Sequence, residues 1–499
     1  MDICIIGSGF AGLCMGIQLK KAGIDSFVIL EKADNVGGTW RDNTYPGAAC
    51  DVPSHLYSFS FEPNHDWSRK FSPQPEIQAY LEHCAEKYEL MPHIRFGTEV
   101  SAAKFDASLG RWSISTQGGD TLHARVLVPA VGQLSRPAYP SIPGLEHFPG
   151  DAFHSARWDH DYDLGGKTVA VVGTGASAIQ FVPQIAKTAK QVHVFQRSAP
   201  WILPKPDRAF AGIEHKLFHG LPGFGRAYRG SIYCTMESRA VGFQGFTSLL
   251  KFVGWQATRH LKRWVEDPEL REALTPDYTI GCKRVLLSND YYEAMVRENV
   301  NLVTSSIDRI EGDTIITADG TRRAVDAIIF GTGFKASEFL APMEIAGLGG
   351  RELNEEWVGG AEAYKGISVA GFPNLFMLYG PNTGLAHNSI VYMIESQVSY
   401  IMDCLRTLED RPAAYLDVRR DVQTRYNAWI QSEVENSPWQ DCQSWYRAEG
   451  GKNTANWPGF TFAYRAKTRR VNLADYELHE AAWQSDSPRD SYVASSVSR

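Results

Sequence analysis

The sequence predicts an α/β protein with two parallel-sheet units and a helical insertion. A short apolar strand, a glycine-rich turn and a helix pattern follow one another in DICIIGSGFAG at the N-terminus, and again in KTVAVVGTGASAIQ in the middle of the chain. Each is followed by a second apolar strand, SFVILEK or QVHVFQR. Residues 205–280, rich in helix formers, glycine and aromatics, interrupt the second unit. Alternating strand and helix patterns are typical of parallel sheets covered by helices.

The composition excludes several classes of protein. The 499 residues, 43% of them hydrophobic, suffice for several domains with buried cores. The formal net charge of −7 argues against nucleic acid as a partner, because phosphate binding needs a basic face. The eight cysteines are scattered without CxxC, so we expect neither a disulfide framework nor a metal. No apolar run reaches the roughly eighteen residues of a spanning helix, so we expect no stable membrane insertion and, most simply, a cytoplasmic protein.

The first unit has the glycine spacing of a Rossmann-like dinucleotide-binding domain. Gly7, Gly9 and Gly12 follow the apolar strand and open the helix, with Phe10 between them. Glycines at these places allow a tight turn, let a pyrophosphate approach backbone N–H groups, and let helix and strand pack closely. The positive end of the helix then faces the phosphates. The next strand ends at Glu31 and Lys32.

The second unit repeats this pattern with one change. Gly173 and Gly175 match the first two glycines, but Ala178 stands in the third place, which is an accepted variant. The turn between them is completed by three further residues that we expect at the phosphates: Thr174, Ala176 and Ser177.

The two units differ at the tip of their second strand. Glu31 stands 24 positions after Gly7, and Arg197 stands 24 positions after Gly173 (31 − 7 = 197 − 173 = 24). A carboxylate accepts hydrogen bonds from a ribose diol and repels a 2′-phosphate, whereas a guanidinium binds that phosphate. We therefore expect FAD in the first unit and NADPH in the second, the alternative being that Arg197 is an ordinary surface charge.

Two further strands predict how the chain is divided. ARVLVPAVGQLSRP and VDAIIFGTGF are each a buried strand that ends in a small-x-Gly turn, as expected where the chain returns to a dinucleotide site. We expect a discontinuous FAD-binding domain, which comprises residues 1–132 with 333–499. The expected NADPH-binding domain comprises residues 133–204 with 281–332. The expected helical insertion comprises residues 205–280.

Four motifs carry a resemblance to a known family. They are Phe148-x-Gly150-xxx-His154-xxx-Trp158-Asp159, Gly37-Gly38-x-Trp40-xxxx-Tyr45-Pro46-Gly47-xxx-Asp51, the segment KRVLLSNDYY from Lys283, and SWYRAEGGKNTANWPGF with Trp445. In this order, the chain resembles a type I Baeyer–Villiger monooxygenase, a class B flavoprotein monooxygenase related to flavin-containing monooxygenases. The Trp158-Asp159 ending separates it from the N- and S-oxygenating relatives, whose motif typically ends in Tyr or Phe. The segment YGPNTGLAHNS departs from the best-known cyclic-ketone enzymes of the family.

The resemblance implies a reaction. NADPH reduces FAD, dioxygen adds at the flavin C4a, and the resulting peroxyflavin attacks a ketone, which ends as an ester or lactone. Negative charge develops on the peroxide and on the tetrahedral oxygen, so a permanently protonated donor is required. Arg284 takes that role by resemblance, and Asp51 is its carboxylate partner. From the residues alone, an ordinary ion pair or helix cap is the simpler interpretation of these two.

The resemblance also assigns the remaining cofactor contacts. Thr39 and Trp40 flank the flavin, Lys283 shares the 2′-phosphate with Arg197, and Trp445 covers the nicotinamide and excludes water. Four other residues are expected at the cofactors: Gly38, Tyr57, Val100 and Ser198. The stretch Phe148 to Asp159 shows no clear strand or helix pattern, so we interpret it as a hinge-like linker. In it, Phe148 and Trp158 are packing anchors, and His154 couples cofactor position to the active site.

Three alternative functions share parts of this pattern. An N- or S-oxygenating flavin-containing monooxygenase would not need Arg284 to support attack on a carbonyl. The second alternative is an NADPH-dependent flavoprotein reductase that reduces disulfides without oxygenation. Such an enzyme needs two cysteines near the flavin, and the scattered cysteines of this sequence argue against it. A non-catalytic nucleotide sensor would bind both cofactors and consume no dioxygen.

Overall fold

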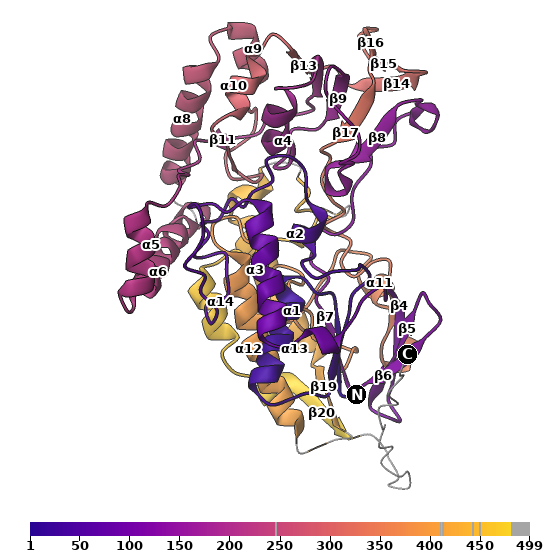
Figure 1. The fold of residues 1–499 in the computed structure, drawn as a ribbon. Coiled ribbons are helices and arrows are strands. Elements are labelled where there is room, and N and C mark those ends of the chain that lie inside the picture. The colour runs from indigo at the N-terminus through magenta and orange to yellow at the C-terminus, as the bar shows by residue number, and fades with distance from the viewer. Residues whose placement is uncertain (245–246, 410, 412–413, 442–443, 449–450, 481–499) are drawn as a thin grey trace, which may run out of the picture.

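The computed structural model describes residues 1–244, 247–409, 411, 414–441, 444–448 and 451–480. Two large parallel sheets organise this part of the chain, one in the upper and one in the lower half of the view (Figure 1). We call the sheet that contains the N-terminal strand, with its helices, the first unit. We call the other sheet, with its helices, the second unit.

The sheet of the first unit has four parallel strands, because each strand here is a short fully or partly apolar run that is covered on both faces. In spatial order the strands are β3 (Ile94–Arg95), β2 (Phe27–Leu30), β1 (Ile3–Ile6) and β7 (Val126–Pro129). Helix α1 (Phe10–Lys21) leaves the glycine turn after β1 and packs against α12 (Ile390–Glu409). Helix α3 (Gln74–Lys87) packs against α1 as well.

The sheet of the second unit has five parallel strands. In spatial order they are β13 (Val300–Val303), β10 (Gln191–Phe195), β9 (Thr168–Val172), β17 (Ala327–Phe330) and β8 (Asp151–His154). Helices α4 (Ala178–Ile185) and α10 (Tyr291–Met295) pack against each other beside this sheet. The apolar faces of α4, β9 and β10 meet in one buried core.

Both strands that were expected to return the chain to a dinucleotide site do so. β7 pairs with β1 in parallel, and β17 pairs with β9 in parallel. The connections between the two units then meet, because Pro137 pairs with Phe334 and the Ala138 N–H donates to the Gly333 carbonyl at 2.9 Å. The chain therefore crosses from one unit to the other through two adjacent segments.

Smaller sheets complete the frame. A mixed sheet next to the first unit joins β18 (Glu344–Ala346), β4 (Val100–Asp106), β5 (Arg111–Thr116) and β6 (Thr121–Ala124), in which β18 runs parallel to β4 and the other pairs are antiparallel. Three pairs or triplets of strands lie elsewhere: β14 (Ile307–Glu311), β15 (Thr314–Thr317) and β16 (Arg322–Ala324); β11 (Ile202–Leu203) and β12 (Leu286–Leu287); β19 (Ala414–Val418) and β20 (Tyr476–Glu480).

The stretch between β11 and β12 is helical, as its composition predicts. Its helices are α5 (Gly212–Gly220), α6 (Phe224–Ser238), α7 (Ala240–Phe243), α8 (Thr247–Trp264) and α9 (Pro268–Ala273). The C-terminal part adds α13 (Arg420–Glu435) and α14 (Thr461–Lys467) beside α12 (Figure 1). None of the described helices is long and apolar enough to cross a membrane.

The described cysteines are of two kinds. Cys4, Cys14, Cys50, Cys84 and Cys404 are buried free thiols, and Cys234 is an exposed one. Cys282, which directly precedes Lys283, is disulfide-bonded, and the cysteine spacing did not predict this. No group of histidine, cysteine and carboxylate side chains in the described ranges has the arrangement of a metal site.

Candidate active site

The glycine turn of the first unit has no room for side chains. Gly7 has a φ of +99°, and a Cβ there would lie 2.9 Å from the Ala130 carbonyl oxygen of the neighbouring strand. A Cβ on Gly12 would collide with the Gly7 carbonyl oxygen. A Cβ on Gly38, whose φ is +56°, would come within 3.2 Å of the Gly9 Cα. Backbone atoms therefore form the surface of this turn, as close approach of a pyrophosphate requires.

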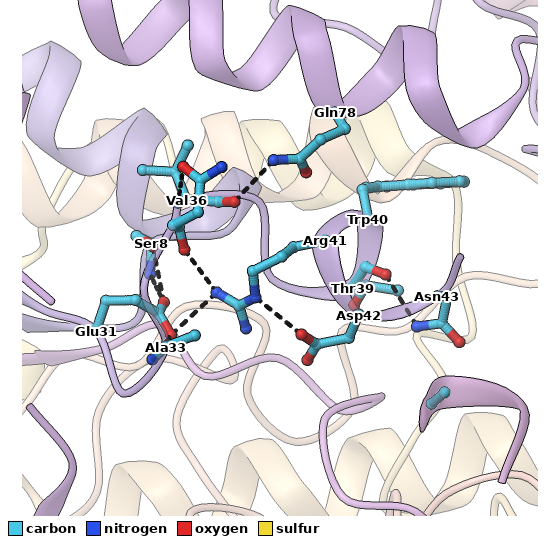
Figure 2. Close-up of polar contacts among 12 residues, drawn as sticks. Ser8, Glu31, Ala33, Val36, Thr39, Trp40, Arg41, Asp42, Asn43 and Gln78 are labelled. Atoms are coloured by element: carbon cyan, nitrogen blue, oxygen red, sulfur yellow. Dashed lines mark hydrogen bonds and ion pairs between the residues drawn. The ribbon is translucent and has the colours of Figure 1, made fainter. Parts of the chain in front are cut away.

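Glu31 lies beside this turn, at the tip of β2 (Figure 2). Its carboxylate is 4% exposed and accepts hydrogen bonds from the Ser8 N–H at 2.9 Å, the Ser8 hydroxyl at 2.7 Å and the Ala33 N–H at 3.0 Å. The Arg41 guanidinium lies 3.1 Å away and also pairs with Asp42 at 2.8 Å. Burial alone would raise the pKa of Glu31, but these donors and the Arg41 charge outweigh it and lower the pKa. Glu31 is therefore an anion at neutral pH.

Sequence reasoning missed Ser8 and Arg41. Ser8 stands between two glycines of the turn, and Arg41 directly follows Trp40 in the Gly-Gly-x-Trp motif, so their places in the motifs were the available signal. Figure 2 shows Arg41 between Glu31 and Asp42, which joins the tip of β2 to the short helix α2 (Thr39–Asp42).

Aromatic side chains surround the same turn. The ring centroids of Phe10 and Tyr57 are 5.1 Å apart, and those of Trp40 and Tyr57 are 5.6 Å apart, both edge to face. The Trp40 indole N–H donates to the Tyr57 hydroxyl at 3.1 Å. Thr39 is exposed, and its carbonyl accepts a hydrogen bond from the Asn43 side chain at 2.9 Å. The sequence-predicted residues Phe10, Thr39, Trp40 and Tyr57 thus lie near one another.

Val100 and Lys32, which were also predicted at the first cofactor, differ in burial. Val100, the first residue of β4, belongs to the same buried apolar cluster as Leu30, and Lys32 is exposed next to Glu31.

The second turn has the same backbone but is more open. Gly173 has a φ of +104°, and a Cβ there would lie 2.6 Å from the Gly331 carbonyl oxygen. Ala178 is accommodated because the residue that faces it is Gly331, where a Cβ would come within 3.0 Å of the Ala178 Cβ. The Thr174 hydroxyl donates to the Ser198 carbonyl at 3.2 Å, whereas Gly175 and Ala176 are exposed and Ser177 is partly exposed.

The tip of β10 carries a small basic cluster. Arg197 is exposed there, and the Lys283 ammonium donates to the Ser198 hydroxyl at 3.1 Å. The Lys283 ammonium also lies 4.4 Å from the centre of the Tyr278 ring. Burial and the nearby Arg197 charge both lower the pKa of Lys283. Within the described ranges neither Arg197 nor Lys283 forms an ion pair, so the cluster keeps its capacity for an anion.

Arg284 and Asp51 are brought together from 233 positions apart. The Arg284 Nη2 and Nε both donate to the Asp51 Oδ2, at 2.5 and 3.1 Å. The Asp51 charge raises the pKa of Arg284 above its ordinary range, and the Arg284 charge outweighs burial to lower that of Asp51. The Arg284 side chain nevertheless remains 38% exposed, and its Nη1 has no hydrogen-bond partner among the described residues. Arg284 is therefore a cation that Asp51 holds in place, and it has N–H groups that this pair does not use.

Three further residues near this pair were missed by sequence reasoning. The hydroxyls of Tyr379 and Tyr446 lie close enough to Arg284 to interact with its charge. Burial raises the pKa of both hydroxyls, so both are neutral and can donate hydrogen bonds. Lys205, at the start of the helical stretch, adds a positive charge near Asp51, and burial lowers its pKa.

The Gly-Gly-x-Trp motif runs from one unit to the other. Its first glycine, Gly37, donates to the Ser8 carbonyl at 3.0 Å in the first unit. Its Tyr45 hydroxyl donates to Gln180 of α4 at 2.8 Å, and a Cβ on Gly47 would lie 2.7 Å from the Gln180 carbonyl oxygen. The motif ends at Asp51, which pairs with Arg284. Because the motif runs from one unit to the other, Asp51 lies between them.

The stretch Phe148 to Asp159 is not a linker, which corrects our expectation. Residues Asp151–His154 form the edge strand β8, because β17, which is far along the chain, provides a parallel partner. A Cβ on Gly150 would collide with the Asp326 carbonyl oxygen and crowd the Phe148 ring. Trp158 packs on Phe153 and Phe181 with ring centroids 5.3 and 5.4 Å away, as an anchor. The partly buried Asp159 accepts from the Asp161 N–H at 2.9 Å.

His154 lies under both crossover segments. Its ring is fully buried and packs against Tyr139 and Phe334, whose ring centroids are 5.5 and 5.6 Å away. Its Nδ1 accepts a hydrogen bond from the Ala156 N–H at 3.0 Å, so Nε2 carries the proton of the neutral ring. Burial lowers the pKa of His154 to about 4.

Trp445 is not packed into the site. Its side chain is 44% exposed and lies against Tyr446, with ring centroids 4.3 Å apart. Its neighbour Tyr446 is the residue that approaches Arg284. Part of the motif that contains Trp445, at residues 449–450, lies outside the described residues.

The donor sets fit the two cofactors that the sequence predicts. The first turn offers a side-chain-free backbone surface and a buried carboxylate, which suit a pyrophosphate and a ribose diol. The second offers a similar turn and an unpaired basic cluster, which suits a 2′-phosphate. Arg284 lies between the two units, where two such cofactors would meet.

Comparisons with known proteins agree with this geometry. Residues 4–210 match the family model described as pyridine nucleotide-disulphide oxidoreductase. The chain is 48% identical to a Baeyer-Villiger monooxygenase of Pseudomonas aeruginosa, over 95% of this chain and 91% of that protein. The solved structure of an oxidized steroid monooxygenase bound to NADP is 32% identical, with a TM-score of 0.86 over 96% of this chain and 99% of that one. A structure of OTEMO with FAD and NADP is 26% identical, with a TM-score of 0.88 and the same coverage. The chain therefore belongs to the Baeyer–Villiger monooxygenase family.

Proposed function

We propose that this enzyme oxygenates ketones and that Arg284 is the residue on which the reaction depends. The chain is an FAD- and NADPH-dependent flavoprotein monooxygenase of the Baeyer–Villiger type, which inserts one oxygen atom of dioxygen next to a carbonyl to give an ester or lactone. When bound, reduced FAD supplies the activation of dioxygen. The remaining steps of the proposal concern what the side chains of this chain do.

FAD binding is assigned to the first unit. Gly7, Gly9, Phe10 and Gly12 would hold the pyrophosphate, and Glu31 would accept hydrogen bonds from the adenosine ribose with Lys32 and Val100 alongside. Gly38, Thr39, Trp40 and Tyr57 would face the isoalloxazine end. The aromatic cluster and the ionised Glu31 carboxylate at the tip of β2 support this assignment. The discontinuous domain that we expect from the sequence, residues 1–132 with 333–499, is the proposed FAD-binding domain.

NADPH binding is assigned to the second unit, residues 133–204 with 281–332, and residues 205–280 are the proposed helical insertion. Gly173, Thr174, Gly175, Ala176 and Ser177 would hold the pyrophosphate. Arg197, Ser198 and Lys283 would hold the 2′-phosphate, which the unpaired cations at the tip of β10 support. The exposed Trp445 offers an apolar face that would cover the nicotinamide and exclude water.

Arg284 would stabilise the negative charge that develops on the substrate oxygen. A guanidinium with a raised pKa stays charged and gives up no proton, so it donates hydrogen bonds to an oxyanion without protonating it. Asp51 fixes the plane of the guanidinium through one oxygen and leaves its outer N–H groups free. The single observation that carries this proposal is a paired but partly exposed Arg284 between two cofactor sites.

The test is a comparison of Arg284→Ala with Arg284→Lys in the flavin-loaded enzyme. We expect Arg284→Ala to lower ester or lactone formation by about 100-fold or more, since removal of one oxyanion donor typically costs that much. Arg284→Lys should recover only part of the rate, because an ammonium cannot reproduce the two N–H donors, Nε and Nη2, that hold the Asp51 Oδ2. Labelled dioxygen, a ketone panel and mass spectrometry measure the product.

Sulfoxidation of a thioether serves as the internal control, because it needs no carbonyl oxyanion. If Arg284→Ala oxidises ketones at the wild-type rate, the assignment of Arg284 is wrong. If the wild-type enzyme forms only hydrogen peroxide with every ketone of a broad panel, the substrate class is wrong.

A further inference from the structure

Helix α8 carries apolar side chains on its outward face. Leu249, Phe252 and Trp255 are 39%, 53% and 54% exposed, and they follow one another at intervals of three residues along one stripe. The Phe252 and Trp255 rings stack with centroids 5.8 Å apart. The opposite face of the helix is buried in the protein. Another face of α8 packs against the protein core. Core packing therefore does not explain why this outward stripe is apolar.

The buried face of α8 is well defined. Leu250, Ala257 and Leu261 are each less than a tenth exposed, at 7%, 2% and 2%. Helix α8 contacts β11 and α10 through this face and stands at the outer edge of the molecule (Figure 1). The orientation of the helix, and with it the outward direction of the apolar stripe, is thus fixed by the fold.

The charges of α8 are all of one sign. Lys251, Arg259, Lys262 and Arg263 are exposed, and residues 247–264 contain no aspartate or glutamate, although the chain as a whole has a net charge of −7. The Arg259 guanidinium lies 5.6 Å from the centre of the Trp255 ring. Within the described ranges, none of the four cations forms an ion pair. The outward face is therefore apolar at one end and basic along its length.

This combination favours an anionic lipid surface over a second copy of the chain. A symmetric dimer through this face would bring two acid-free helices together, and their like charges would repel. An interfacial helix has the observed arrangement, with Trp, Phe and Leu toward the acyl chains and Lys and Arg toward the phosphates. It needs no membrane-spanning helix, and none occurs among the described helices.

We propose that α8 docks this enzyme on an anionic phospholipid surface. Leu249, Phe252 and Trp255 enter the boundary between headgroups and acyl chains, and the four cations contact lipid phosphates. The contact is peripheral and reversible, because three partly exposed apolar side chains give a small buried area and the basic part is screened by salt.

The test uses the flavin-loaded enzyme and vesicles of two compositions. We expect binding to vesicles of phosphatidylglycerol and phosphatidylcholine to be about tenfold stronger than to vesicles of phosphatidylcholine alone, and to weaken in high salt. The double variant Phe252→Glu/Trp255→Glu should lower binding to the anionic vesicles by about tenfold or more. The double variant Lys262→Glu/Arg263→Glu should lower binding and flatten its salt dependence. Vesicle flotation measures the bound fraction.

Val358→Glu is the matched control, because Val358 is 85% exposed and lies outside α8. It should bind vesicles as the wild type does. Flavin content and activity on a water-soluble ketone should be unchanged in all variants, which shows that they are folded.

Two results would overturn the proposal. One is equal binding to both kinds of vesicle, or binding that Phe252→Glu/Trp255→Glu does not alter. The other is a dimer in sedimentation experiments that the same variant dissociates, with no binding to vesicles, because the stripe would then be an interface between copies.

Discussion

The two dinucleotide units share a turn and differ at the tip of the next strand. Gly7 and Gly173 have nearly the same φ, +99° and +104°, and each lies against a carbonyl of a neighbouring strand. At the tip, Glu31 is 4% exposed and held by Ser8, Ala33 and Arg41, whereas Arg197 is exposed and unpaired within the described ranges. In the proposed assignment, the backbone of the turn would hold a phosphate in both units, and the tip residue would select the nucleoside.

The difference in exposure is as informative as the difference in charge. A buried carboxylate is kept ionised only by several donors, so the Glu31 site is rigid before any ligand arrives. The exposed basic cluster of the second unit costs little to hydrate, which suits a cofactor that binds, reacts and is exchanged. Four experiments test this comparison.

Charge reversal at Glu31 should have the largest effect. In Glu31→Arg, a cation would lie beside Arg41 in a nearly closed space, so we expect FAD affinity to fall by about 100-fold or more. The flavin-to-protein absorbance ratio of the purified variant measures this loss. Asp34→Arg is the matched control, since it makes the same charge change at an exposed site nearby, and it should keep its flavin. Full flavin content in Glu31→Arg would refute the assignment of the first unit.

Charge reversal at Arg197 should affect the other cofactor. In Arg197→Glu, repulsion replaces attraction at the 2′-phosphate, so we expect KM for NADPH to rise by about 100-fold while KM for NADH changes little. Steady-state oxidation of the two cofactors measures the ratio. Lys190→Glu, an exposed change just before β10 and thus at its opposite end, should leave both constants unaltered. An equal rise for NADPH and NADH would contradict a 2′-phosphate contact.

His154, at the crossover of the two units, should respond to pH. Its pKa of about 4 in the folded protein lies below the ordinary 6.5, so the unfolded chain binds the proton first as pH falls. This contribution to stability is complete above about pH 6.5 and is lost toward pH 4. We expect the free energy of unfolding to fall by roughly 2 kcal/mol more in the wild type than in His154→Asn between pH 7 and pH 5. Denaturant titrations at the two pH values measure it.

His147→Asn is the control for that experiment, because the His147 side chain is 83% exposed and hydrated in both states. An identical pH dependence in the wild type and His154→Asn would show that the buried ring does not resist protonation. If His154 also couples cofactor position to the active site, the His154→Asn variant should release more hydrogen peroxide per NADPH oxidised, while its flavin content stays normal.

The smallest effect is expected at the third position of the second turn. Ala178→Gly should cost about 0.5–1 kcal/mol of stability, since glycine is a poor helix former, and leave KM for NADPH within about twofold. Gly12→Ala in the first unit should instead lose flavin, because its Cβ would collide with the Gly7 carbonyl. Thermal unfolding and flavin content distinguish the two. Equal effects of these changes would mean that the two turns are packed alike.

Local patterns predicted the parts of the site that local geometry builds. The glycine turns, the strand tips and the helical stretch all depend on residues within about 30 positions, so spacing was sufficient for them. Phe148 to Asp159 was misjudged because β8 is an edge strand, and its partner among the described strands, β17, lies far along the chain. Ser8 and Arg41 were missed because neither a hydrogen bond nor an ion pair to Glu31 leaves a periodic signal, and the disulfide at Cys282 likewise has no spacing signal.

By itself, the sequence determined that two dinucleotide units exist and which charge each presents to its nucleoside. A tight turn with positive φ requires glycine, and a strand tip exposes whichever side chain stands there, so both are properties of short segments. Only the tertiary structure decided that Arg284 meets Asp51 between the units and that His154 lies under the two crossovers. These contacts join segments that the two sheets hold at a common boundary, and no local pattern specifies that boundary.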